Sequence, residues 1–286
     1  MSVRKGTFTP SGYWGDHWTV PESPTYRIAA IPESKGTAAT LGLVEVTRRA
    51  NKYGLATVWF PAIGQASAEG VKLLPIIRPA ASLLKAMQAS PLRFHDALVF
   101  GRGIIASLKT LHMEAGIVHG SLIPEFINFD RFGKLFFRFN WASTFLDSSG
   151  KAVYAADYGP LRQRSIWVCH PSEVSETPTI PSRMGDIHAA YAVISWMIRN
   201  PDSYVRPVGG ASVADWLEWK RVYQFAPPVI GSHVPEETAN RILSLHQQIV
   251  ELVLAPIDEQ PQYDTIIGLL TDMIDVAASI RGAINA

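Results

Sequence analysis

The sequence predicts an α+β protein, with strands in its first third and mainly helices in the remainder. Residues 26–31, 55–63 and 71–77 are short runs of aliphatic and aromatic side chains, which are typical of strands. After residue 93, apolar residues recur instead at helical spacing over longer segments. The chain has 286 residues, which is long enough to bury a sizeable core.

One helix is predicted among the strands of the N-terminal third. It spans residues 37–53 and ends at Gly54, and a turn through residues 64–70 is predicted to join the two strands that follow it. The phosphate-binding motif G-x-G-x-x-G is absent. Gly12 and Gly15 stand among large aromatic residues, so we expect a surface turn there, because a phosphate cradle needs bare backbone N–H groups.

The next predicted helix spans residues 94–116, where apolar residues repeat at helical spacing up to Gly116. Residues 130–133, Asp-Arg-Phe-Gly, predict a tight turn between two short strands, because Asp and Gly have their usual turn roles there. Residues 211–225 predict a further helix, with Ser212 as its N-cap.

The segment 116–130, GIVHGSLIPEFINFD, is the most informative part of the chain. It resembles the catalytic loop of protein kinases, H-R-D-L-x-x-x-x-N, in which the Asp accepts the proton of the substrate hydroxyl and the Asn holds a metal ion. His119 and Leu122 keep their places in this pattern. The positions of the kinase Arg, Asp and metal-binding Asn are held by Gly120, Ser121 and Phe126.

Other parts of the chain resemble protein kinases in the expected order, from about Leu73 to the C-terminus. Residues 94–116 are similar to the helix before the catalytic loop, residues 182–202 to the buried helix after it, and residues 254–274 to the closing helices. Two further kinase positions keep their residue type: Glu173 matches the Glu of A-P-E, and Asp186 matches the Asp of the buried helix. Three are replaced: Pro32 stands for the ATP-binding Lys, Asn140 for the Asp of D-F-G, and Gln260 for the Arg that pairs with the A-P-E Glu.

The resemblance implies a bilobal protein-kinase-like fold. Its small β-rich N-lobe would be residues 1–77 and its larger, mainly helical C-lobe residues 78–286. It also implies that phosphoryl transfer is lost. The Ser121 hydroxyl is a poor substitute for a carboxylate base, Phe126 has no metal-binding atom, and Asn140 offers a neutral oxygen where Mg²⁺ prefers an anionic one.

We therefore expect a pseudokinase: not an enzyme, without cofactor or metal, that binds partner proteins as a scaffold or regulatory subunit. Two alternatives remain open. One is a nucleotide sensor that binds ATP without metal, and the other is a transferase of different chemistry on the same fold. The second would need acidic metal ligands, and none is visible near residue 140.

Several polar residues are expected to have structural roles. In kinases the counterpart of Asp186 accepts hydrogen bonds from the catalytic-loop backbone, so Asp186→Ala would cost about 1–3 kcal/mol of stability. Glu173 is also expected to be structural, although Gln260 cannot form the kinase ion pair with it. His119 is expected to pack and hydrogen-bond in the core. Glu45, the acidic residue available on the helix at 37–53, would have no Lys partner.

The predicted helix at residues 211–225 is the candidate surface for a protein partner. Trp216, Trp219 and Tyr223 recur at helical spacing and form an aromatic stripe. Such a stripe usually packs into a core, and this is the slightly favoured reading. If part of it is exposed, Trp216 or Trp219 would anchor a partner, because Trp and Tyr dominate interface energetics.

Composition excludes several classes of function. Lys and Arg number 26 and Asp and Glu number 25, so a nucleic-acid or anionic-membrane footprint is not expected. The N-terminus lacks the apolar core of a signal peptide, and the longest apolar runs are too short to span a membrane. The single cysteine, Cys169, excludes an internal disulfide. We expect a cytoplasmic protein without membrane insertion.

Overall fold

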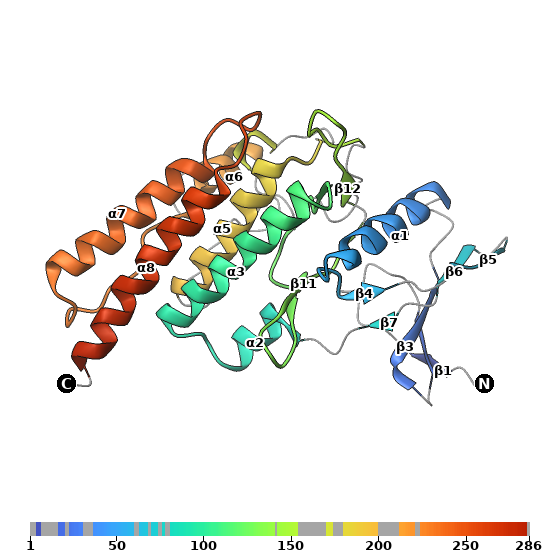
Figure 1. Cartoon of the computed structure of the whole chain (residues 1–286), viewed down its shortest axis with the longest axis horizontal. Coiled ribbons are helices and arrows are strands. Elements are labelled where there is room, and N and C mark those ends of the chain that lie inside the picture. The colour runs from blue at the N-terminus through green and yellow to red at the C-terminus, as the bar shows by residue number, and fades with distance from the viewer. Residues whose placement is uncertain are drawn as a thin grey trace.

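The protein is a mixed α+β molecule, mostly helical with small antiparallel sheets. The structure, a computed structural model, describes residues 4–6, 17–20, 23–30, 37–59, 63–67, 70–73, 76–77, 81–140, 142–153, 170–173, 180–199, 212–220 and 224–284. The α+β class is therefore confirmed. In Figure 1 the N-terminal strands and helix α1 lie at one end of the molecule, and the long helices form the other end.

The N-terminal sheet is antiparallel. Its strands β1 (Arg4–Gly6), β2 (His17–Val20), β3 (Ser23–Ala30), β6 (Gly70–Leu73) and β5 (Ile63–Ser67) follow one another in that order, and β7 (Ile76–Ile77) pairs with both β3 and β4 (Val58–Trp59). The turn predicted at residues 64–70 has the right place but is too long. Most of it belongs to β5, which shifts register between Ile63 and Ala66 and then returns through a tight hairpin, with Ser67 opposite Gly70.

Helix α1 (Thr37–Lys52) confirms the helix predicted at residues 37–53. Its buried face includes Leu43, Val46 and Ala50. The helix ends before Gly54, which has a φ of 70° that favours glycine. Glu45 forms an ion pair with Arg48 on the same helix, at 3.1 Å, where the sequence predicts no Lys partner.

The C-terminal part contains six helices among the described residues. They are α2 (Leu83–Ala89), α3 (Phe94–Met113), α5 (Arg183–Arg199), α6 (Val213–Trp219), α7 (Glu236–Val253) and α8 (Tyr263–Ile284). The helix predicted at residues 94–116 is confirmed as α3 but ends at Met113. The helix predicted at residues 211–225 is shorter than expected, because α6 ends at Trp219.

Short strands surround the segment that resembles a catalytic loop. Strand β9 (Ile117–Val118) pairs with β12 (Thr144–Phe145), and β10 (Ile127–Phe129) lies between β8 (Ala81–Ser82) and β11 (Leu135–Phe137). The predicted turn at residues 130–133 does connect β10 to β11. These pairings hold residues 119–126 between two small sheets.

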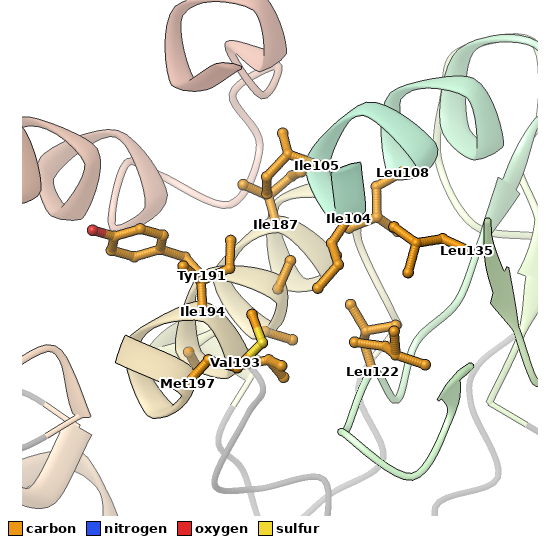
Figure 2. Packing of buried hydrophobic residues seen from close by; sticks show 14 of the residues in the cluster. Ile104, Ile105, Leu108, Leu122, Leu135, Ile187, Tyr191, Val193, Ile194 and Met197 are labelled. Carbon is orange, nitrogen blue, oxygen red and sulfur yellow. The ribbon is translucent and has the colours of Figure 1, made fainter. Parts of the chain in front are cut away.

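The core of the C-terminal part forms around α5. Every residue of α5 from Met184 to Ile198 is buried, and this helix packs against α3 and α7, which both also contact α8. Figure 2 shows Ile104 and Ile105 of α3 close to Ile187 of α5. The two helices approach closely at Gly101, where an added Cβ would lie 2.8 Å from the Ile194 side chain. Each such buried aliphatic side chain contributes about 1.5–3 kcal/mol.

Among the described residues, no helix combines the length and apolar character needed to cross a membrane.

Candidate functional site: a loop anchored by a buried aspartate

Asp186, in the first turn of α5, holds the loop that contains His119 and Gly120. Its side chain is buried, with 2% of the residue exposed. One carboxylate oxygen, Oδ2, accepts hydrogen bonds from the His119 N–H at 2.6 Å and from His112 Nε2 at 2.9 Å. The other, Oδ1, accepts one from the Gly120 N–H at 2.8 Å. The hydrogen bonds expected between Asp186 and the loop backbone are therefore present.

His112 connects this carboxylate to α8. Its Nδ1 lies 2.6 Å from the hydroxyl of Tyr263, and the imidazole is fully buried. Nε2 faces the carboxylate, and Nδ1 on the other side of the ring faces the Tyr263 hydroxyl. Burial raises the pKa of the Tyr263 phenol, so its proton stays in place to make this bond. The Tyr263–His112–Asp186 chain thus links α8, α3 and α5 to the loop.

His119 packs in the core, as the sequence predicts. The residue has no exposed surface, and its ring lies 5.5–6.1 Å from the rings of Phe126, Phe137 and Phe139. Nε2 donates to the Arg138 carbonyl at 3.1 Å. Burial lowers the pKa of His119, so the imidazole is neutral at pH 7. A neutral, enclosed imidazole supports packing here.

Gly120 allows the loop to pass against the next turn. Its φ of 75° is in the left-handed region, and an added Cβ would collide with the carbonyl oxygen of Ala142. The Ser143 hydroxyl donates to the His119 carbonyl at 2.8 Å and accepts from the Asn140 N–H at 3.3 Å. The contact between the two turns therefore leaves no room for a side chain at residue 120.

The positions that would carry kinase chemistry are buried. Exposed fractions are 4% for Ser121, 1% for Phe126 and 2% for Asn140. The Oδ1 atom of Asn140 accepts the Ala142 N–H at 2.9 Å, which makes this side chain part of a turn. Pro32 and Trp141 lie outside the described residues. Within the described ranges, no group of three His, Cys, Asp or Glu residues could hold a metal ion.

Glu173 ties the segment 170–173 to the start of α5. Its carboxylate accepts hydrogen bonds from the His170 N–H at 3.0 Å, the Ser182 N–H at 3.2 Å and the Ser182 hydroxyl at 2.9 Å. Burial raises the pKa of Glu173 to about 7. Gly185 leaves space for the carboxylate, because a Cβ there would collide with both of its oxygens.

Gln260 has a different partner from the one the kinase pattern suggests. Its Oε1 accepts a hydrogen bond from Arg183 at 2.7 Å, so the cation near this corner is Arg183 of α5. At Gln260 the sequence predicts only the loss of an ion pair with Glu173. Residues 183 and 260 are far apart in the chain, and no spacing rule connects them.

The aromatic stripe near α6 is less exposed than a docking surface for a partner protein would need. Trp219 has 5% of its surface exposed, which matches the core interpretation and removes it as an exposed anchor. The side chain of Trp216 and the whole of Tyr223 lie outside the described residues. Ser212 caps α6 as predicted, since its hydroxyl accepts the Asp215 N–H at 3.2 Å.

A second buried network was not anticipated from the sequence. The Tyr191 hydroxyl of α5 lies 2.6 Å from Nδ1 of His246 in α7, and His246 Nε2 donates to the Phe225 carbonyl at 3.0 Å. Burial lowers the pKa of His246 and raises that of Tyr191, so both groups are neutral. In this network the Tyr191 hydroxyl donates to Nδ1 of His246, and Nε2 donates to the Phe225 carbonyl. This network fixes the chain after α6 to the helical core.

A scan of protein-family models gave no match to this sequence, and a search of curated proteins found no similar sequence. The resemblance to protein kinases therefore stays a prediction from the sequence motifs, and the activity of the chain is a matter of proposal.

Proposed function

We propose that the chain is a pseudokinase, a protein-kinase-like protein without phosphoryl-transfer activity that binds another protein as a scaffold or regulatory subunit. The proposal includes a bilobal fold, with a small lobe at residues 1–77 and a larger one at residues 78–286. The observation that carries it is a contrast within one loop. The backbone at His119 and Gly120 is anchored to Asp186, whereas Ser121 and Phe126 are buried and carry no charge.

Phosphoryl transfer depends on a positioned base and on Mg²⁺ to neutralise the phosphates. At the positions in question the chain has a hydroxyl, a phenyl ring and an amide whose oxygen already accepts the Ala142 N–H. Hard divalent cations need several oxygen ligands, preferably anionic. With the chemistry replaced and the anchor kept, protein binding is the function that best fits the loop.

One observation favours a nucleotide sensor as the second candidate. The amide nitrogens of Asn128 and Asn140 are buried and have no hydrogen-bond partner in the described part of the chain. Both are donors that would suit an acceptor atom on a bound molecule. A sensor that binds ATP without metal would use such neutral donors.

Thermal-shift measurements with ATP and ADP, each with and without Mg²⁺, separate these candidates. We expect no shift of the melting temperature under any of the four conditions. A shift that needs no Mg²⁺ and is lost in Asn128→Leu would favour the sensor. A Mg²⁺-dependent shift, together with transfer of radiolabelled phosphate from ATP to protein, would contradict the proposal.

A further inference from the structure

The hairpin between β10 and β11 exposes an aromatic side chain on a well-ordered turn. Phe132 is 79% exposed. Asp130 Oδ1 accepts hydrogen bonds from the N–H groups of Phe132 at 2.8 Å and Lys134 at 3.0 Å, and the Gly133 N–H donates to the Asp130 carbonyl at 3.0 Å. These three hydrogen bonds fix the backbone of the turn, and none of them involves the Phe132 ring.

One cationic group lies against this ring, and a second, the Lys134 ammonium, lies over the Phe136 ring of the same hairpin, 5.6 Å from its centroid. The guanidinium of Arg131 lies 4.7 Å from the centroid of the Phe132 ring. Lys134 reaches the end of α1, where an added Cβ on Gly54 would lie 2.9 Å from its ammonium nitrogen. Tyr53, which precedes that glycine, is 40% exposed, and its hydroxyl donates to the Glu114 carbonyl at 2.9 Å.

We define the Phe132 surface as Lys52, Tyr53, Arg131, Phe132 and Lys134. Its three cations are exposed, and in the part of the chain that the structure describes none forms an ion pair with a carboxylate. The carboxylate of the turn, Asp130, is engaged by backbone N–H groups. The surface thus combines two exposed aromatic rings with positive charge that no described carboxylate pairs with.

Such a surface suits a protein partner. A turn whose backbone is already fixed loses little conformational entropy on binding, and aromatic and Arg side chains are enriched among the residues that dominate binding energy. An anionic bilayer is a weaker fit, because stable membrane attachment needs more than one short apolar insertion with a few cations. Charge complementarity calls for carboxylates on the partner.

We propose that the Phe132 surface is the docking site for an acidic segment of a partner protein, with Phe132 entering an apolar pocket of that partner. This inference rests on the proposed scaffold function and deepens it by assigning the surface and the chemistry of the partner. It also moves the expected anchor from the buried Trp219 to an exposed aromatic residue.

Photocrosslinking in the 286-residue chain tests the site. Benzoylphenylalanine is placed at residue 132 or, as a control, at residue 229, where Val229 is 87% exposed and apolar. Both proteins are exposed to lysate of the native host, and the crosslinked segment of any captured protein is identified by mass spectrometry. The expected result is a protein captured at 132 and not at 229, through a segment that contains Asp or Glu beside apolar residues.

The identified segment is then synthesised and its affinity measured. Phe132→Ala should weaken binding about thirtyfold, as expected for an anchor residue. Lys134→Glu should weaken binding more at low salt than at high salt. Arg241→Glu makes an equal charge change at an exposed site of α7 and should have no effect on binding. Thermal melts of each variant establish that the fold is retained.

Three outcomes would overturn the proposal. The first is that a partner protein is captured by the probe at residue 229 and not by the probe at residue 132. The second is that Phe132→Ala leaves the affinity for the segment unchanged. The third is Phe132-dependent binding to phosphatidylcholine vesicles that contain phosphatidylserine. In the first case the scaffold function stands and the docking site is wrong. Absence of any captured protein at 132, at 229 and at the exposed Leu217 would count against both.

Discussion

Replacing Asp186 with Ala removes the acceptor of three hydrogen bonds at once. The N–H of His119 and the Nε2–H of His112 are buried, and the N–H of Gly120 is partly buried. A buried donor left without an acceptor costs about 1–3 kcal/mol. From the sequence alone, this loss of stability is expected only for the backbone N–H groups of the loop. Because His112 adds a further buried donor, we expect about 3–5 kcal/mol, with water in the vacated space relieving part of the total.

Thermal and urea denaturation measure this loss. For a protein of this size it corresponds to a fall in melting temperature of about 6–20 °C. Asp186→Asn is the companion variant, because it leaves no cavity but places an amide N–H₂ group among the donors. It should therefore also be strongly destabilised. Asp264→Ala is the matched control: Asp264 binds Lys109 at 2.7 Å, yet its side chain is 81% exposed, so its loss should cost about 0–1 kcal/mol.

The reasoning would be refuted if Asp186→Ala melted close to the parent temperature, or if Asp186→Asn were as stable as the parent. A double-mutant cycle with His112→Ala adds a second criterion. Because the two side chains share a buried hydrogen bond, their coupling should be about 0.5–3 kcal/mol. Strict additivity would mean that His112 does not contribute to the anchor.

Three further predictions concern two buried ionisable groups and the backbone conformation at residue 120. Burial raises the pKa of Glu173 from 4.5 to about 7, so its contribution to stability is present at low pH and lost as pH rises through this interval. The Glu173→Gln variant lacks this loss. As pH rises from 4.5 to 7, its free energy of unfolding, measured by urea titration, should therefore increase by about 3 kcal/mol relative to the parent. Burial lowers the pKa of His170 from 6.5 to about 4, so this residue has the opposite slope, and His170→Gln should lose stability with rising pH relative to the parent. Gly120→Ala should cost about 2–4 kcal/mol in the same assay, from left-handed backbone and a collision with Ala142, whereas Gly133→Ala, with a φ of 79° and open space, should cost about 1–2 kcal/mol. Equal losses for the two glycine variants would exclude the collision.

The fold could be predicted best where one face of an element is buried over many residues. Helix α1 and the start of α3 lie where the sequence predicts them, because their apolar repeats are long and a glycine follows each helix. Residues 64–70 predict a turn, because most of them are small or polar. Residues 64–67 instead extend β5, which pairs with the neighbouring β6, and β6 pairs in turn with the distant β3. The early end of α6 was likewise not predictable from its aromatic spacing.

The candidate site divides in the same way. Asp186 could be placed through the resemblance of the surrounding segments, because the loop and its helix both have recognisable patterns. The partners that complete the anchor could not. His112 looks like one more residue in an amphipathic helix, and Tyr263 lies 151 residues away, so only the packing of α3 against α8 brings them together. Phe132 was identified as part of a turn, but its exposure depends on the whole surface.

The anchor of the loop uses backbone atoms, whereas the chemistry that kinases perform there uses side chains of neighbouring residues in the loop. Asp186 binds the backbone N–H groups of residues 119 and 120, which every residue except proline provides. The chemistry would depend on the side chains at residues 121 and 126. Substitutions at those two positions can therefore remove catalysis while the anchoring hydrogen bonds persist. Gly120 is the exception, because the carbonyl of Ala142 occupies the space that a side chain would need. It follows that Ser121→Asp alone would return a carboxylate to the loop without restoring either a metal site at Phe126 or room for an Arg at residue 120.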